Sequence, residues 1–120
     1  MPSRLKQLSR PLLAALLPVL LLLAAGPGFR TQQLFDDHYA KHGREFGRVT
    51  QFEYLRMAQE LRDARVGGLI LEARKPGGIF TRFDSRRGWF GAYNPDLTIR
   101  TFFIPNDGER YFRRQAGRND

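Results

Sequence analysis

Two histidines, His38 and His42, are the residues of this chain best suited to move a proton near neutral pH. They are four residues apart in a segment expected to be helical, so their side chains would lie on one side of that helix. Lys41 and Arg44 flank His42, and Gly43 follows it as a helix terminator. An exposed imidazole among cations can exchange protons beside a bound phosphate group, so His42 is the first candidate for acid–base chemistry.

The same pair permits two other interpretations. Histidines at positions i and i+4 can bind zinc, but a third ligand is needed and the chain has no H-E-x-x-H motif. Alternatively, His38 packs against a sheet while His42 lies at the C-terminal end of its helix, where a cation is favoured. We favour the packing role for His38 and the acid–base role for His42, with no metal or other cofactor.

Several other kinds of site are excluded by what the sequence lacks. The chain has no cysteine, so disulfides, thiolate zinc sites and a cysteine nucleophile are excluded. It has neither a P-loop nor a G-x-G-x-x-G motif, so nucleotide-triphosphate chemistry is not indicated. Ser85 lies in a predicted turn without a nucleophile elbow, which leaves serine hydrolase chemistry with little support.

Two helices are expected to position the histidines. Apolar and amphipathic residues recur with a helical period over 31–41, after Thr31 as a candidate N-cap. Thr50 and Glu53 then form a T-x-x-E capping box for a second helix, which is expected to run to about Ala64. The residues expected on its buried face are Leu55, Ala58 and Leu61.

After Gly67 and Gly68 the pattern changes to the alternation typical of strands. Four short segments rich in β-branched and aromatic residues, separated by turn sequences, cover 69–74, 79–84, 89–94 and 98–104. Their spacing predicts successive antiparallel hairpins. The predicted fold class is therefore α+β, with two N-terminal helices packed on one face of a four-stranded antiparallel meander sheet. The other face would be open to a ligand, and the polar chain after Asn106 would be a loose tail.

A polar row across this sheet is a second candidate feature. Arg82 lies within an otherwise apolar strand, where a charge must face solvent or a ligand. Loop lengths suggest a register in which Arg82, Gly91 and Thr101 are neighbours, with Gly91 leaving room between the two polar side chains. A one-residue slip in either hairpin would destroy the row. The alternative is that Arg82 simply faces water.

The N-terminal residues 1–28 have the layout of a secretory signal, with a basic start, an apolar run over 11–25 and small residues after it. An uncleaved anchor, the only expected contact with a membrane, is the alternative. A domain over 29–112 and a polar tail over 113–120 would follow. The chain has 20 basic and 12 acidic residues; without the three basic residues of the leader, a net charge of +5 remains. A small, basic, secreted or periplasmic domain suits an anionic partner: nucleic acid, anionic lipid or an acidic protein.

Several short motifs resemble a known family. They are H-Y-A-K-H-G-R-E-F-G over 38–47, R-F-D over 82–84, F-G over 90–91 and T-I-R-T-F-F-I-P over 98–105. Together they are similar to the colicin D-type ribonuclease toxin domains, part of the wider barnase, EndoU and RelE-like group of bacterial toxins. The resemblance covers roughly residues 32–112.

This resemblance implies a set of site residues. His42 would be the catalytic histidine, Lys41 its cationic neighbour, Thr101 a hydroxyl residue and Phe103 an aromatic residue on a late strand. Tyr39 stands where the family pattern has a second lysine, while Thr101 and Phe103 replace a serine and a tryptophan. The resemblance also implies RNA as the substrate, tRNA among the candidates, and a cognate immunity protein as a partner.

Such residues can cleave RNA without a metal ion. Neutral His42 would take the proton of a ribose 2′-hydroxyl that attacks the adjacent phosphate, giving a cyclic phosphate. The side chains of Lys41, Arg82 and Thr101 would stabilise charge on the phosphoryl oxygens. The side chains expected to bind the RNA, by stacking on bases or by charge, are Phe103, Trp89, Tyr93 and Arg44.

Two other functions stay open. A non-catalytic exported module would bind an acidic protein or an anionic surface through arginines at the sheet edge, namely Arg74, Arg86 and Arg87. A degenerate relative of the toxins would keep the fold alone. Binding to RNA or lipid would weaken steeply as salt rises, whereas a hydrophobic protein contact would not.

Overall fold

The computed structural model describes residues 25–118. Most of the leader predicted over 1–28 therefore lies outside the described residues. Within the described part, no helix is both long and apolar enough to cross a membrane.

Two helices precede the sheet, as the sequence predicts. Helix α2 spans Gln32–His42 and is followed by a short 3-10 helix, η1, over Gly43–Phe46; helix α3 spans Gln51–Asp63. Both predicted N-caps are confirmed. The hydroxyl of Thr31 accepts a hydrogen bond from the Leu34 amide at 3.1 Å. Thr50 and Glu53 form the reciprocal capping box, which satisfies amides that a helix start leaves unpaired.

The sheet is the predicted meander. Strands β1 (Ile70–Arg74), β2 (Phe80–Asp84), β3 (Trp89–Tyr93) and β4 (Ile99–Phe103) lie in the order β1-β2-β3-β4. Every neighbouring pair is antiparallel. The α+β class and the four-stranded antiparallel sheet are therefore confirmed.

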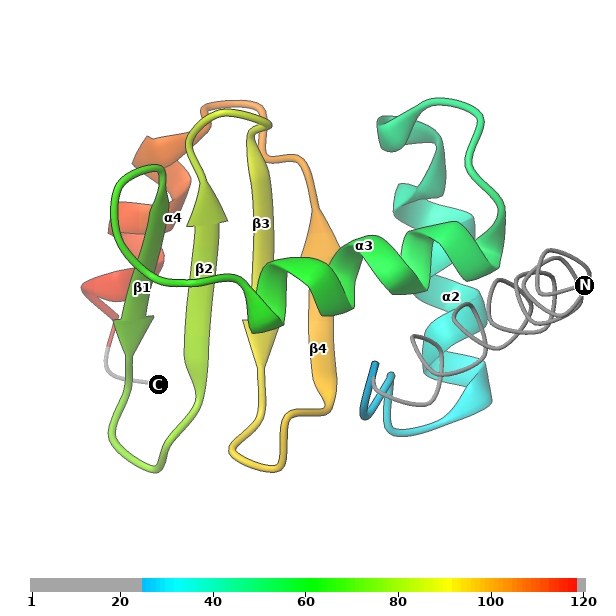
Figure 1. Ribbon diagram of the computed structural model, residues 1–120, viewed down its shortest axis with the longest axis horizontal. Helices are drawn as coiled ribbons and strands as arrows, with labels where there is room; N and C mark the ends of the chain where they lie inside the picture. Colours follow the sequence, from blue (N-terminus) through cyan, green and yellow to red (C-terminus); the bar gives the residue numbers. More distant parts are fainter. Residues whose placement is uncertain (1–24, 119–120) are drawn as a thin grey trace, which may run out of the picture.

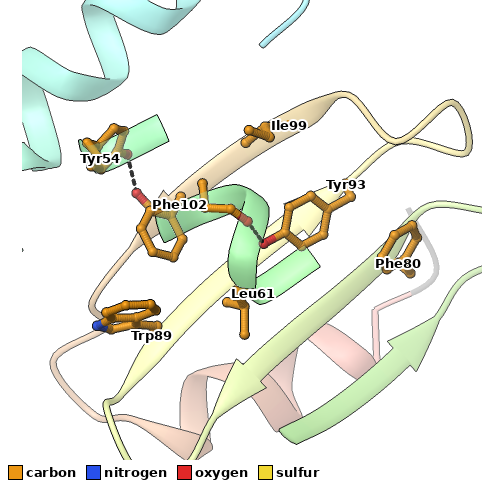
Figure 2. Close-up of a cluster of buried hydrophobic side chains, with 8 residues drawn as sticks. Tyr54, Leu61, Phe80, Trp89, Tyr93, Ile99 and Phe102 are labelled. Atoms are coloured by element: carbon orange, nitrogen blue, oxygen red, sulfur yellow. Dashed lines mark hydrogen bonds between the residues drawn. The ribbon is translucent and has the colours of Figure 1, made fainter. Parts of the chain in front are cut away.

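The front face of the sheet, toward the viewer in Figure 1, is covered by α3, which crosses β4 and β3. Figure 2 shows the core beneath it, built mainly from aromatic side chains. Two buried tyrosines satisfy their hydroxyls there: Tyr54 donates to the Phe102 carbonyl, and Tyr93 donates to the Ala58 carbonyl at 2.9 Å. Burial raises the pKa of both phenols well above the usual range, so they remain neutral donors.

The back face carries a helix that the sequence analysis did not predict. Residues after Asn106 were expected to be a loose tail, but Glu109–Ala116 form helix α4. Figure 1 places α4 behind the sheet, on the side of β1 and β2. The prediction was wrong because a charged segment needs few apolar residues to dock: Phe112 is buried against Phe83, and Tyr111 packs beside it on the same cluster.

Helix α2 lies beside the sheet rather than on the predicted shared face. Figure 1 shows it alongside β4, at the edge of the sheet, and none of its residues is buried. The chain just before it joins this edge, where the Ile99 amide donates to the Gly28 carbonyl at 2.9 Å. Buried Arg62 of α3 holds the preceding segment by donating to the carbonyls of Ala25 and Pro27. The edge of β4 is thus closed by chain from the N-terminal side.

A β-bulge changes the predicted register of β4. The turn pairs as expected, since the Asn94 amide donates to the Thr98 carbonyl at 2.9 Å. Tyr93 then pairs with Ile99, but Ala92 pairs with Thr101, so Arg100 is an extra residue in β4. A bulge reverses the alternation of side chains beyond it. Thr101 therefore lies on the back face, and the predicted row with Arg82 and Gly91 does not form.

Candidate functional site

The ring of His42 is held by three neighbours at the top of α2. Its Nδ1 lies 2.7 Å from Oε2 of Glu45. The ring stacks on Phe103 of β4 with centroids 5.1 Å apart, and on His38 with centroids 6.2 Å apart. Only 15% of the His42 side chain is exposed. With Nδ1 occupied by the carboxylate, Nε2 is the ring nitrogen left for an incoming proton donor.

Glu45 is a site residue that sequence reasoning missed. One carboxylate oxygen contacts His42, and the other accepts the backbone amide of Ile104 at 2.9 Å. The side chain thereby ties η1 to the end of β4 and fixes the imidazole relative to the sheet. A carboxylate on Nδ1 orients the imidazole, which is also what the acid of serine protease triads does. The available signal was the i, i+3 spacing from His42.

His38 has the packing role favoured from sequence, although it packs between rings rather than on the sheet. It stacks on Phe29 with centroids 5.0 Å apart and lies next to His42 on the other side. Its Nδ1 is buried and has no hydrogen-bond partner within residues 25–118. Burial, with smaller contributions from the charges of His42 and Lys41, lowers the pKa of His38 below its ordinary value of 6.5. His38 is therefore neutral at pH 7.

Lys41 and Arg44 are exposed cations on either side of His42. Lys41 lines a hollow of about 250 Å³ on the same side of α2 as His38, together with Leu34 and Asp37. Arg44 lies on η1, one residue before Glu45. Both add positive charge to the surface of the segment that carries His42, and positive charge attracts anions.

Thr101 and Phe103 lie on the back face of β4, and the ring of Phe103 contacts His42. Phe103 contacts the rings of His42, Phe90 and Tyr111, so its ring supports His42. Thr101 is half-buried and lines two adjoining hollows of about 370 Å³ and 160 Å³. The bulge thus brings the predicted hydroxyl residue to the face that carries the predicted catalytic histidine.

We call this surface the α2–β4 groove. It comprises two hollows, whose linings include Leu34, His38, Lys41, Arg100 and Thr101, and the neighbouring stacked rings of His42 and Phe103. The hollow around Thr101 and the hollow around Lys41 share Leu34.

Arg82 does not belong to this groove. Its side chain is 10% exposed and forms an ion pair with Glu72 at 2.7 Å. A second guanidinium nitrogen donates to the Ala64 and Leu61 carbonyls at the end of α3. Arg82 therefore caps α3 from the front face, and its charge is neutralised inside the fold. The Arg82 guanidinium is therefore not available to solvent or to a phosphate group on the back face.

Trp89 and Tyr93 are also core residues rather than stacking platforms. Both project toward α3 in Figure 2, and Tyr93 is fully buried. The pairing of Gly91 with Arg82 is as predicted, but the space that Gly91 leaves is filled by Tyr93. A Cβ at this position would lie 2.2 Å from the Tyr93 hydroxyl oxygen. The stacking role predicted for these two aromatics is therefore wrong, because their strand positions face the front.

Tyr39, where the resemblance expects a lysine, has a structural role. Its hydroxyl donates to the Val49 carbonyl at 2.5 Å, and its ring packs against the front core. A Cβ on Gly43 would lie 2.6 Å from this ring, so glycine is needed beside it. The position contributes no charge to the groove.

The arginines proposed for a binding module do not form one surface. Arg74 is the last residue of β1 and pairs with Glu72, whereas Arg86 and Arg87 lie in the turn at the opposite end of β2. Burial acts to raise the pKa of Asp84, but hydrogen bonds from the side chain and amide of Arg87, and from the amide of Arg86, hold it below the ordinary value. The positive charge of Arg87 is thus balanced by the Asp84 carboxylate.

A hollow larger than those of the groove lies at this same turn. Its volume is about 540 Å³, and it is lined by Glu60, Leu69, Ile70, Asp84, Arg86 and Arg87. Arg87 pairs with both carboxylates, at 2.6 Å from Asp84 and 3.1 Å from Glu60. The opposing charges leave it little attraction for an anion, so size alone does not make it the better site.

Residues 25–118 contain no group of three or more histidine, aspartate or glutamate side chains placed to hold a metal ion. The chain matches no protein-family model, and no curated protein is significantly similar to it.

Proposed function

We propose that the chain is a metal-independent endoribonuclease of the bacterial toxin type, acting in the α2–β4 groove. The observation that carries the proposal is the arrangement of His42, with Nδ1 on Glu45 and its ring stacked on Phe103. An imidazole oriented by a carboxylate beside free cations is suited to proton transfer at a phosphate ester. The motif resemblance to colicin D-type domains supports the same residue.

The proposed reaction is an internal transesterification. The Nε2 atom of neutral His42 accepts the proton of the 2′-hydroxyl, whose oxygen forms a bond to the adjacent phosphorus. The bond from phosphorus to the 5′-oxygen breaks, and that oxygen takes up a proton from water, to which His42 afterwards returns the proton that it accepted. The products are a 2′,3′-cyclic phosphate and a 5′-hydroxyl. All protons and bonds balance without an added reactant.

Charge in the transition state would be stabilised by Lys41 and by the Thr101 hydroxyl. Arg82, which the sequence analysis assigned to this role, is paired elsewhere. Glu45 acts as a positioning residue: it selects the tautomer with the proton on Nδ1 and stabilises the imidazolium that forms.

The proposal includes the cellular setting suggested by sequence. Export by the N-terminal leader would place the enzyme in the periplasm or outside the cell, and a cognate immunity protein would protect the producer. An acidic partner suits a domain of net positive charge.

The test uses the purified full-length chain, total RNA and tRNA, with EDTA present throughout. We expect cleavage with cyclic phosphate ends, and a loss of about 10² to 10⁴ in rate for His42→Gln. Arg86→Gln, at an exposed arginine of the β2–β3 turn, is the matched control and should cleave like the parent. Equal cleavage by parent and His42→Gln would contradict the proposal. RNA binding without cleavage by the parent would favour the non-catalytic module instead.

A further inference from the structure

The α2–β4 groove includes a hollow at the start of α2, two helical turns from His42. This hollow has a volume of about 370 Å³ and lies between the start of α2 and the β3–β4 hairpin. Its lining consists of Arg30, Leu34, Ala92, Asn94, Ile99, Arg100 and Thr101. Two arginines and a hydroxyl thus surround a space with an apolar wall.

Arg100 is directed into the hollow by the bulge. As the extra residue of β4, it lies beside Thr101 instead of opposite a residue of β3. Its guanidinium donates to Oδ1 of Asn94 at 2.9 Å. The side-chain amide nitrogen of Asn94 in turn donates to the Thr98 hydroxyl at 2.9 Å. One hydrogen bond to a neutral amide orients the arginine but leaves its charge and its other N–H donors for a ligand.

Arg30 adds a second cation at the opposite wall. It pairs with Asp96 at 3.5 Å, and both side chains are more than half exposed. An exposed pair of this kind is weak, so Arg30 can turn to a phosphate group at little cost. Hydrogen bonds from Thr98 hold Asp96 in the hairpin, and with the nearby charge of Arg30 they lower the pKa of that carboxyl.

The position of this hollow relative to His42 identifies what it would hold. Leu34, His38 and His42 follow one another at intervals of four residues, along one side of α2. On β4, Thr101 and Phe103 lie on the same face with Cα atoms about 7 Å apart. Leu34, which lines the hollow, lies eight residues before His42, about 12 Å along α2. The hollow is therefore within about two nucleotide steps of the imidazole along an extended single strand.

We propose that this hollow is a subsite for a nucleotide close to the scissile linkage. Its phosphate would bind Arg100 and Arg30, while the exposed side chain of Leu34 contacts the sugar or base. The proposal rests on the proposed function, because it takes the ligand to be a single-stranded oligoribonucleotide. It assigns Arg100 to substrate binding and not to the chemical step.

Binding of a non-cleavable oligonucleotide tests the subsite separately from catalysis. A fluorescent 2′-O-methyl RNA hexamer is titrated with the full-length chain at several salt concentrations. We expect Arg100→Gln to weaken binding about tenfold at low salt. The slope of log affinity against log salt should also fall by about one unit, as when one phosphate contact is lost.

Arg86→Gln is the matched control, because it removes the same charge from an exposed turn outside the groove. Thermal melting of both variants checks that each is folded. Equal affinity and salt slope for Arg100→Gln and the parent would overturn the subsite, as would equal losses in both variants. Equal losses in both variants would show that net charge alone attracts the RNA.

Cleavage of a dinucleotide and a hexanucleotide separates the two proposals. If the parent cleaves both, and Arg100→Gln raises KM for the hexanucleotide about tenfold while leaving kcat unchanged, the subsite is supported. If the parent cleaves and Arg100→Gln changes neither constant, the subsite is wrong and the proposed function stands. If the parent cleaves neither, yet hexamer binding depends on Arg100, the proposed function is wrong and the anion subsite stands.

Discussion

The two faces of the sheet differ in where their polar groups find partners. On the front face, Arg82 and the two buried tyrosines are satisfied by carbonyls or a carboxylate within the fold. On the back face, Thr101 is half-buried and lines two hollows, and the buried hydroxyl of Thr81 has no hydrogen-bond partner within residues 25–118. The front face is a closed core, whereas the back face retains polar groups that can bind a ligand.

This difference explains why a charge within a strand was a poor guide to the site. A buried arginine costs free energy unless it is paired, and both an ion pair and a phosphate ligand meet that need. Arg82 has its partner in Glu72, 2.7 Å away. Arg100 is exposed and bonded only to a neutral amide in the contacts of the described chain, so it keeps its capacity for an anion.

The largest expected effect would come from the front face. Arg82→Met removes the buried partner of Glu72, which keeps only the exposed Arg74, and leaves the end of α3 without its cap. The free energy of unfolding should therefore fall by about 3 kcal/mol. Denaturant unfolding measures the loss. At a temperature where the variant is still folded, RNA cleavage per folded molecule should be unchanged. A variant that keeps its stability but has lost RNA cleavage would indicate that Arg82 belongs to the catalytic site.

Thr101→Val tests the back face. The substitution keeps the shape of the side chain and removes the hydroxyl proposed to stabilise the transition state. We expect kcat to fall about 10²-fold, with the free energy of unfolding changed by less than about 1 kcal/mol. Steady-state cleavage and denaturant unfolding give the two values. A fall in the free energy of unfolding without a fall in kcat would show that Thr101 has only a structural role in β4.

Gly91→Ala probes the tight packing of the front core. The added Cβ would displace the Tyr93 hydroxyl from the Ala58 carbonyl. Overpacking of this kind costs about 1–3 kcal/mol, which thermal or denaturant unfolding will detect. Cleavage by the folded protein should remain at the parent level. Ala92→Ser, on the neighbouring residue and the opposite face, serves as the comparison.

Glu45→Gln sharpens the assignment of the positioning residue. The amide can still accept the Ile104 N–H, so the link between η1 and β4 is kept while the negative charge is lost. We expect kcat to fall at least about tenfold with KM unchanged, since the amide no longer selects the productive tautomer. Unchanged kcat would mean that Glu45 serves the fold alone.

The smallest effect concerns pH. Because burial lowers the pKa of His38 below 6.5, the unfolded chain binds a proton at a higher pH than the folded chain. The contribution of neutral His38 to the free energy of unfolding is therefore lost as the pH falls below about 6.5. The stability of the fold rises with pH across that window. His38→Phe, which keeps a ring beside Phe29, should reduce the difference in unfolding free energy between pH 5 and pH 7.5. An unaltered difference would contradict this assignment.

Local patterns in the sequence were sufficient for the helix caps, the four strands and their order. These features depend on neighbouring residues, such as the capping box at Thr50 and Glu53 or the turn between Asn94 and Thr98. His42 could also be proposed as a candidate catalytic residue, because its flanking residues belong to one short motif.

Features that depend on distant contacts could not be predicted. The bulge at Arg100 adds one residue to β4 and moves Thr101 to the other face, and no turn length reveals it. The polar segment after Asn106 forms α4 because the back face offers a site for Phe112. Glu45 has its second partner 59 residues later in the chain, at Ile104.

The central claim is that chemistry belongs to the back face and can be removed without loss of the fold. The most direct test measures RNA cleavage in EDTA and denaturant unfolding on one preparation of His42→Gln beside the parent. We predict that cleavage falls by at least about 10²-fold while the free energy of unfolding changes by less than about 1 kcal/mol. Cleavage at the parent rate, or a loss of activity that follows unfolding in proportion, would contradict the claim.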